Sequence, residues 1–453
     1  MSPAALLPSA KPSVVIQTSL LSLLYRQNMK APPNQDTTAT PETKMENNLK
    51  DTIQFFQELA PIQTNSVLQP KFAHELAPQD AQQTRIIVHR RFLALVEAFL
   101  AHKREHGSSY EKALYTTSWT WQQQVARLIE KRPLVFMGAG DFTVLRNGKS
   151  IESPTREWGS VGTEAENGNK YLSLMEYLSY DEIMLGSLIG VSSPSYFIND
   201  GNRYNKGVPG DSGTFEPRGV IIGLVGARFE RKDRMDSVHC LPTVASPKQH
   251  PLLSKVFQDF FGCPKKNVPF DFDMYKSRMR IPAEILLCEA NDRANTADKK
   301  AYIYVVGLGL GVWKVNSAQT KHYVEAFADA LDMLGPALPC ISTMEFAYIN
   351  APPDQERLIK RTGQKFGIDI IFSKRNPAEK LTGAREGQLL VLSYAWDGNS
   401  YPGNEYWIGN MVGSGDPAAA CMSTVSQLHN PQLNPQFLER IQVWGLPVDE
   451  TQT

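Results

Sequence analysis

Residues 301–311 read AYIYVVGLGLG, a run of apolar residues that enters three closely spaced glycines. This pattern is typical of a core strand, and the glycines let the backbone turn sharply where the strand ends. Residues 317–334 then carry apolar side chains at helical spacing and are followed by a Gly-Pro stop. A strand, a turn and a helix in this order form the repeating unit of an α/β fold.

Strands and helices alternate on both sides of this unit, and a helix is predicted to begin at Pro417. Apolar runs predict further strands at residues 219–229, 341–349, 368–372 and 389–395. Residues 190–205 are rich in Ser, Asn and Gly beside aromatics, and they predict a long loop, either ligand-facing or turn-rich. The alternation favours an α/β protein with a mostly parallel sheet covered on both faces.

The domain organisation follows from changes in composition along the chain. Residues 85–132 contain two amphipathic helical patterns, which predict a helical cap in front of a core domain at residues 133–440. Much of residues 1–84 is rich in Pro, Gln, Thr and Asn, which predicts a disordered, low-complexity tail. Residues 441–453 are expected to form a second tail.

The composition also limits the partners and the compartment. Lys plus Arg equals Asp plus Glu at 47 each, so no global field draws the chain to nucleic acid or to an anionic membrane. No stretch reaches the roughly 18 apolar residues that a membrane span needs. Five cysteines without a CxxC motif fit reduced thiols, so we expect a cytoplasmic protein. Residues 1–35 lack Asp and Glu, a weaker indication of an organelle-targeting segment.

The three glycines after the strand that begins at residue 301 form a candidate phosphate loop. Glycines at positive φ would turn N–H groups outward, and a helix start favours anions, so the loop could cradle a diphosphate. It lacks the Gly-Lys-Ser/Thr of a Walker A loop and the acidic residue of a dinucleotide fingerprint. A simple tight turn is the alternative explanation. The predicted ligand contacts are the seven loop residues Gly307, Leu308, Gly309, Leu310, Gly311, Val312 and Trp313.

A second polar loop follows the strand at residues 389–395, at the end of a core strand where open α/β sheets bind ligands. Its carboxylates and amides can bind ribose hydroxyls, and its rings can cover a sugar or a base. The candidates are the carboxylates Asp397, Glu405 and Asp416, the amides Asn399 and Asn404, and the ring of Trp407.

Each of these candidates also has an explanation without a ligand. Asp416 before Pro417 makes a good helix N-cap. Glu405 could be a solvated loop residue, and Asp397 and Asn399 could simply form turn hydrogen bonds. The concentration of all of them in one glycine-hinged loop favours a ligand site.

Four motifs carry a resemblance to a known family: GLGLGVW, SKRNPAEKL, YAWDGNSYPGNEYW and SGDPAAACMST. In these motifs the chain resembles the MavL-like arginine-specific macrodomain family of ADP-ribosylhydrolases, with similarity over residues 105–435. The resemblance implies a macrodomain-like α/β/α sandwich that binds ADP-ribose between an Asn-rich loop and a Gly-rich loop. The Gly-rich loop comes first in this chain, so a rearranged strand order is expected.

The resemblance also implies removal of ADP-ribose from arginine side chains of proteins, ubiquitin being one substrate in the family. The family's acidic catalytic residues match Asp397, Glu405 and Asp416, with glutamate at 405 where aspartate is expected. We assign Asp397 to ribose and guanidinium contact, Glu405 to guanidinium binding or water activation, and Asp416 to charge stabilisation or base catalysis, roles that are interchangeable. No cofactor or metal ion is required, although three clustered carboxylates could also bind Mg²⁺.

Two other functions stay open. The protein could bind ADP-ribose or ADP-ribosylated partners without hydrolysing them. Alternatively, SSPSYFINDGNRYN with Arg228 and Glu230 could belong to a transferase that installs ADP-ribose from NAD. The chain lacks a convincing set of Arg, Ser-x-Ser and Glu-x-Glu motifs in the right order for that reaction.

Overall fold

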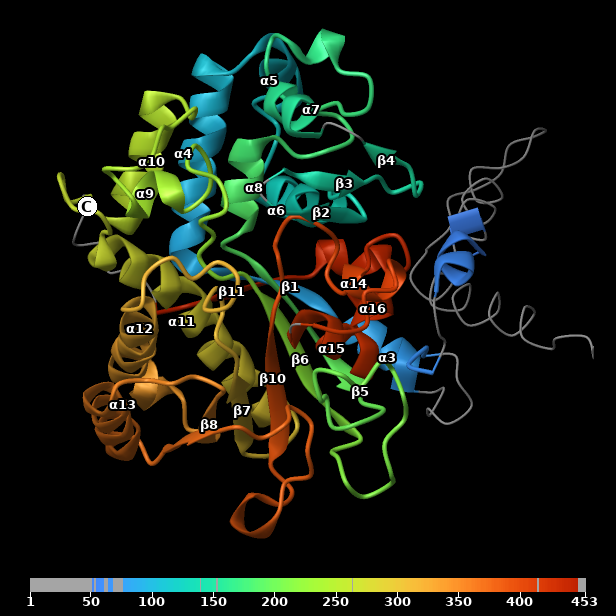
Figure 1. Cartoon of the computed structure of the whole chain (residues 1–453), viewed down its shortest axis with the longest axis vertical. Coiled ribbons are helices and arrows are strands. Elements are labelled where there is room, and N and C mark those ends of the chain that lie inside the picture. Colours follow the sequence, from blue (N-terminus) through green and yellow to red (C-terminus); the bar gives the residue numbers. More distant parts are fainter. Residues whose placement is uncertain are drawn as a thin grey trace, which may run out of the picture.

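The largest element of the structure is a sheet of eight strands. The computed structural model describes residues 51–52, 54–60, 64–67, 76–138, 140–151, 154–262, 264–413 and 415–446. In spatial order the strands are β11 (Ile441–Trp444), β1 (Arg85–His89), β5 (Gly190–Tyr196), β6 (Arg218–Leu224), β10 (Leu389–Ala395), β7 (Ala301–Val305), β8 (Ile341–Ala347) and β9 (Asp369–Ser373) (Figure 1).

The sheet is mostly parallel, as the sequence predicts. β6, β10, β7, β8 and β9 pair in parallel in succession, and β1 pairs in parallel with β11. Among the strands that the structure describes, β5 alone runs antiparallel to both of its neighbours in this sheet. Every residue of β7 is buried, which is typical of a parallel strand covered on both faces.

Long helices flank this sheet. Three of them pack against one another in succession and lie together on the left in Figure 1: α11 (Phe272–Thr296), α12 (Gln319–Leu334) and α13 (Pro353–Lys365). The helix predicted at residues 317–334 is confirmed as α12. Three short helices gather on the right, where α15 packs on β10 and α16 on β5: α14 (Asn404–Trp407), α15 (Gly415–Met422) and α16 (Val425–Leu428).

The upper part of Figure 1 is formed mainly by residues between 90 and 190, with two helices from further along the chain, α9 (Ser237–Cys240) and α10 (Pro251–Phe261), at the upper left. Its other helices are α4 (Arg90–His106), α5 (Ser109–Leu114), α6 (Trp121–Glu130), α7 (Pro154–Ser160) and α8 (Tyr180–Gly186). A small antiparallel sheet lies beside them, made of β2 (Val135–Met137), β3 (Phe142–Val144) and β4 (Ser150–Ile151). This part therefore extends past residue 132, where the sequence suggested the end of a cap.

The structure differs from the expected segment boundaries at both ends of the chain. The stretch 85–132 holds α4, α5 and α6, but it begins with β1, a strand of the large sheet. The stretch 441–453 begins with β11, which pairs with β1. The stretch 1–84 includes the helix α3 (Leu76–Gln83). Each strand is only four or five residues long, so its period could not be separated from that of its surroundings.

A further difference concerns residues 190–205, which we expected to be a loop throughout. Their first half is β5, whose seven residues are all buried. Its serines are tolerated there because buried partners satisfy them: Ser193 Oγ contacts His429 Nε2 (2.8 Å), and Ser195 Oγ contacts Thr424 Oγ1 (2.9 Å).

The targeting segment suggested for residues 1–35 lies outside the described residues. In the part of the chain that the structure describes, no helix combines the length and the apolar character needed to cross a membrane.

A buried ionic cluster ties the edge of the sheet to α11. Glu289 of α11 is fully buried and accepts hydrogen bonds from Arg85 of β1 (2.9 and 3.0 Å), from Arg293 (2.8 Å) and from the indole of Trp444 in β11 (2.8 Å). Burial alone would raise the pKa of Glu289, but the charges of Arg293 and Arg85 outweigh it and lower that pKa. One carboxylate therefore joins two strands and a helix from distant parts of the sequence.

We expect Glu289→Gln to lower the free energy of unfolding by about 3 kcal/mol, because it removes the counter-charge of the buried Arg293 and leaves the partly exposed Arg85 with Asp292 alone. Urea unfolding would measure this. The matched control is Asp369→Asn, which breaks an exposed pair with Arg385 (3.2 Å) and should change stability by less than about 0.5 kcal/mol. Equal losses in the two variants would contradict the structural role of the cluster.

Candidate active site

Three loops meet at the carboxyl ends of β6, β10 and β7, which are adjacent parallel strands. The loop after β7 touches the loop after β6 backbone to backbone. A Cβ on Gly226 would lie 2.3 Å from the nitrogen of Gly309, and a Cβ on Gly309 would lie 2.7 Å from the carbonyl oxygen of Ala227. Gly309 also has a φ of +71°, so both positions require glycine.

The glycine-rich loop presents backbone N–H groups without partners. Leu308 is buried and anchors the loop, and its N–H lies 3.4 Å from the hydroxyl of Tyr323. Among the described residues, the N–H groups of Gly309, Gly311 and Val312 have no hydrogen-bond acceptor. The helix α12 begins only at Gln319, so its dipole is too distant to act at the glycines. Anion binding here would therefore depend on the free N–H groups.

The second loop brings the three predicted carboxylates into one electrostatic cluster. Asp397 follows β10, Glu405 belongs to α14, and Asp416 lies in the first turn of α15. Burial, together with the charges of Asp416 and Asp397, raises the pKa of Glu405 well above its usual range. Burial and the charge of Asp397 likewise raise the pKa of Asp416. Glu405 and Asp416 therefore keep their protons to a higher pH than free carboxylic acids do.

Asp397 is held in a fixed orientation by its own turn. Its Oδ1 accepts hydrogen bonds from the backbone N–H groups of Asn399 (2.7 Å) and Ser400 (3.0 Å), and its Oδ2 accepts from Ser400 Oγ (2.5 Å). Gly398 between them has a φ of +73°. The turn hydrogen bonds considered from the sequence are therefore present, and they orient the carboxylate beside the other two.

Several polar groups around the cluster lack partners among the described residues. The side-chain oxygens of Asn399 and Asn404 and the indole N–H of Trp313 are buried without a hydrogen bond. Buried polar atoms usually have a hydrogen-bond partner in folded proteins, so these three groups in two adjacent loops are candidates for hydrogen bonds to a ligand. None of the described His, Cys, Asp and Glu residues, these carboxylates included, forms a group of three or more that could hold a metal ion.

Trp407, also predicted to contact the ligand, is occupied by packing. Its indole N–H donates to the carbonyl of Ser426 (3.0 Å), and its ring contacts the ring of Phe56 at a centroid distance of 4.8 Å. Asn65 similarly donates to the carbonyls of Ala420 and Ser423, both at 2.8 Å. Residues that we assigned to a disordered tail therefore brace the helices that carry Glu405 and Asp416.

A buried arginine behind the second loop had no signal in the sequence. Arg132 is fully buried, and its guanidinium lies 4.3 Å from the centre of the ring of Trp396. Burial lowers its pKa to about 9, and the charge of Asp397 opposes that shift. Nothing in the local pattern EKRPL distinguishes it from a surface arginine, because its burial depends on contacts made far along the chain.

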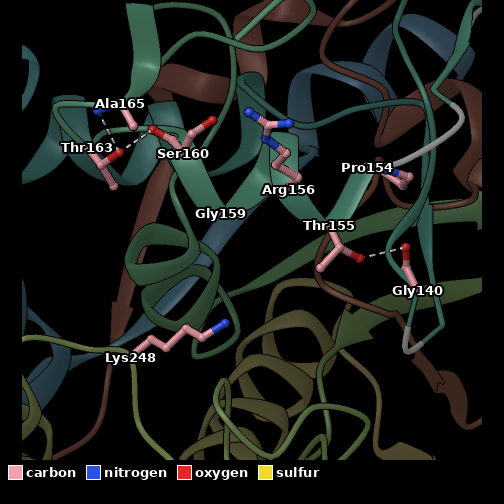
Figure 2. Close-up of a pocket in the computed structure, with 9 residues that line it drawn as sticks. All are labelled: Gly140, Pro154, Thr155, Arg156, Gly159, Ser160, Thr163, Ala165 and Lys248. Carbon is pink, nitrogen blue, oxygen red and sulfur yellow. Dashed lines mark hydrogen bonds between the residues drawn. The ribbon is translucent and has the colours of Figure 1, made fainter. Parts of the chain in front are cut away.

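An open groove elsewhere contains none of the predicted site residues. It is lined by Gly140, Pro154, Thr155, Arg156, Gly159, Ser160, Thr163, Ala165 and Lys248 (Figure 2). Thr155 donates to the carbonyl of Gly140 at its margin (3.0 Å). We place the candidate site at the three loops because the three carboxylates and the buried polar atoms without a partner are there.

The structure is that of an α/β protein whose mostly parallel sheet gathers three carboxylates at its carboxyl edge. Residues 48–249 and 247–443 match the family model described as ADP-ribosylhydrolase MavL-like. The chain belongs to this family, which confirms the resemblance carried by its motifs.

Two relatives from Drosophila melanogaster agree with this assignment. The ADP-ribosylarginine hydrolase CG3568 is 37% identical over 393 residues, which cover 78% of this chain and 76% of the relative. The ADP-ribosylarginine hydrolase CG2909 is 35% identical over 392 residues, with the same coverage of 78% and 76%.

The raised pKa values lead to a prediction about stability. When folding raises the pKa of a carboxyl group, the unfolded chain loses that proton at a lower pH than the folded protein does. The folded state therefore becomes less stable as the pH rises from the pKa of the unfolded chain to the pKa of the folded protein. Asp416→Asn cannot ionise, so we expect it to increase the free energy of unfolding by about 1–2 kcal/mol at pH 8 and by much less at pH 4. Urea unfolding at the two pH values would measure this.

Asp236→Asn is the matched control, because Asp236 is a buried aspartate that forms an ion pair with Arg278 (3.0 Å). This variant should lose stability at pH 8. If Asp416→Asn also lost stability at pH 8, the result would contradict the claim that burial and the charge of Asp397 disfavour the ionised form of Asp416.

Proposed function

We propose that the protein hydrolyses the bond between ADP-ribose and arginine side chains of proteins, with a macrodomain-like α/β/α sandwich as its scaffold. The observation that carries this proposal is the carboxylate cluster, buried at Glu405 and partly buried at Asp397 and Asp416, beside a loop whose N–H groups have no acceptor among the described residues. The diphosphate would lie on the N–H groups of Gly309, Gly311 and Val312, and the distal ribose near the carboxylates. The names of the two Drosophila relatives support the same substrate class.

The chemistry follows from the bond that breaks. Cleavage of the bond between C1″ of the ribose and the guanidinium nitrogen develops positive charge on the sugar, which nearby carboxylates stabilise. Water supplies the hydroxyl group to C1″, and its proton passes to a carboxylate and then to the departing nitrogen. Because their pKa values are raised, Glu405 and Asp416 hold a proton more readily than free carboxylates do, which suits them to such proton transfers. Asp397, fixed by its turn, would contact the ribose and the guanidinium.

Selectivity for arginine would come from the same cluster. A carboxylate can bind a guanidinium through two parallel hydrogen bonds, and the positive charge of the substrate would relieve the repulsion between the three acids. When ADP-ribose is attached through an ester, the linking group is uncharged and has no N–H groups to donate to a carboxylate. The protein substrate, of which ubiquitin is one candidate, would enter with its arginine directed at the cluster.

The first test is release of free ADP-ribose from arginine-ADP-ribosylated ubiquitin and from a second arginine-modified protein. We expect release by the wild type and a loss of at least about 100-fold in Asp397→Ala and Asp416→Ala, because each removes a group that stabilises the transition state. Asp369→Asn, far from the loops, serves as the matched acidic control and should keep wild-type activity.

The alternatives give different results in this test. No release combined with ADP-ribose binding by calorimetry would indicate a binding module. Consumption of NAD with transfer of label to protein would indicate a transferase. Failure of both release and binding would contradict the assignment of the site.

The phosphate loop can be tested separately with a matched pair of glycines. We expect Gly309→Ala to weaken ADP-ribose binding by about tenfold or more, because a side chain at φ +71° and 2.7 Å from a carbonyl oxygen must displace the loop. Gly168→Ala, outside the three loops, should bind as the wild type does, since Gly168 has no positive φ and no atom lies within 4 Å of the added Cβ. Calorimetry with ADP-ribose distinguishes the two, and equal affinities would argue against a diphosphate on this loop.

A further inference from the structure

Arg228 lies at the junction of the three loops. It follows β6, and its side chain is almost completely buried, with 3% exposed. Its Nη1 donates to the backbone carbonyl of Asp397 (2.9 Å), and its Nη2 forms an ion pair with Glu230. The same guanidinium lies 4.5 Å from the centre of the ring of Trp313. One side chain therefore contacts both the carboxylate loop and the glycine-rich loop.

The backbone of Arg228 is anchored to the scaffold. Its N–H donates to Asp236 (2.8 Å), which in turn forms a buried ion pair with Arg278 of α11 (3.0 Å). Arg278 also donates to the carbonyl of Ser187 (3.0 Å). The anchor is therefore part of the rigid core, while the guanidinium reaches out to the two loops.

The contacts of Arg228 are poorly explained by stability alone. Its Nε–H is buried without a hydrogen-bond partner among the described residues, which carries a desolvation cost. Buried ion pairs can often be replaced by apolar side chains of similar volume without loss of stability. What an apolar residue could not supply is a planar group that donates to one loop while it stacks on a ring in the other.

We propose that Arg228 is a positioning residue that holds the carboxylate loop and the glycine-rich loop at a fixed separation. The inference rests on the proposed function, because that separation sets where C1″ lies when the diphosphate is bound. The pairing of Arg228 with Glu230 also accounts for both residues without the transferase considered from the sequence. A small error in this separation would affect the chemical step more strongly than it affects binding.

The experiment compares Arg228→Lys and Arg228→Ala with the wild type, using ADP-ribose release from an arginine-modified protein. We expect Arg228→Lys to lower kcat by about 100-fold, since a displacement of 1 Å can cost that much, while KM and the affinity for free ADP-ribose stay near wild-type values. Guanidinium ion added to Arg228→Ala should restore part of kcat, whereas ammonium at equal ionic strength should not.

Arg218 provides the matched control because it lies at the other end of β6 with similar contacts. Its guanidinium is 4.3 Å from the ring centre of Tyr196 and forms two hydrogen bonds to Asp80 (2.7 and 3.0 Å). Arg218→Lys should keep the wild-type kcat, and guanidinium should not increase the activity of Arg218→Ala.

The outcomes separate this inference from the proposed function. If the wild type releases ADP-ribose and Arg228→Lys releases it equally fast, the positioning role of Arg228 is overturned, whereas the proposed function stands. The positioning role would also be overturned if the Arg228 and Arg218 variants lost kcat in proportion to their loss of thermal stability and guanidinium restored neither. Absence of release by the wild type would overturn both proposals.

Discussion

Parallel pairing of β10 with both β6 and β7 is the constraint on which the site depends. It places the carboxyl ends of three strands side by side, so loops that are far apart in the sequence leave the sheet at one edge. The backbones of two of these loops then approach so closely that only glycine fits at their contact. The acidic loop, the glycine-rich loop and the arginine between them are all consequences of this one arrangement.

The cluster of acids illustrates how a fold can tolerate an unfavourable arrangement where chemistry requires it. Three carboxylates gathered where water is largely excluded repel one another, and the hydrogen bonds of its own turn orient Asp397. The buried carboxylate of Glu289, in contrast, is matched by two arginines and a tryptophan. The contrast between a matched structural carboxylate and unmatched ones at the loops is itself a signature of a functional site.

The sequence was most informative where apolar runs were long and bounded by glycine or proline. The strand at residues 389–395, the helix α12 and the parallel sheet were predictable for this reason. Short strands were not predictable. β1 has five residues and β11 has four, which is too few to show the two-residue periodicity of a strand. The sequence places the three acidic residues close together along the chain, but the packing of the Trp407 ring on Phe56 could not be predicted, since Phe56 lies far away in sequence.

The late position of β10 in the sequence also matters while the chain is being made. Until residues 389–395 leave the ribosome, β6 and β7 have no strand to lie between them, and each offers an unpaired edge. All three acidic residues follow β10. The acidic cluster therefore cannot assemble until residue 416 has been made, and chaperones that cover open sheet edges can act in that interval.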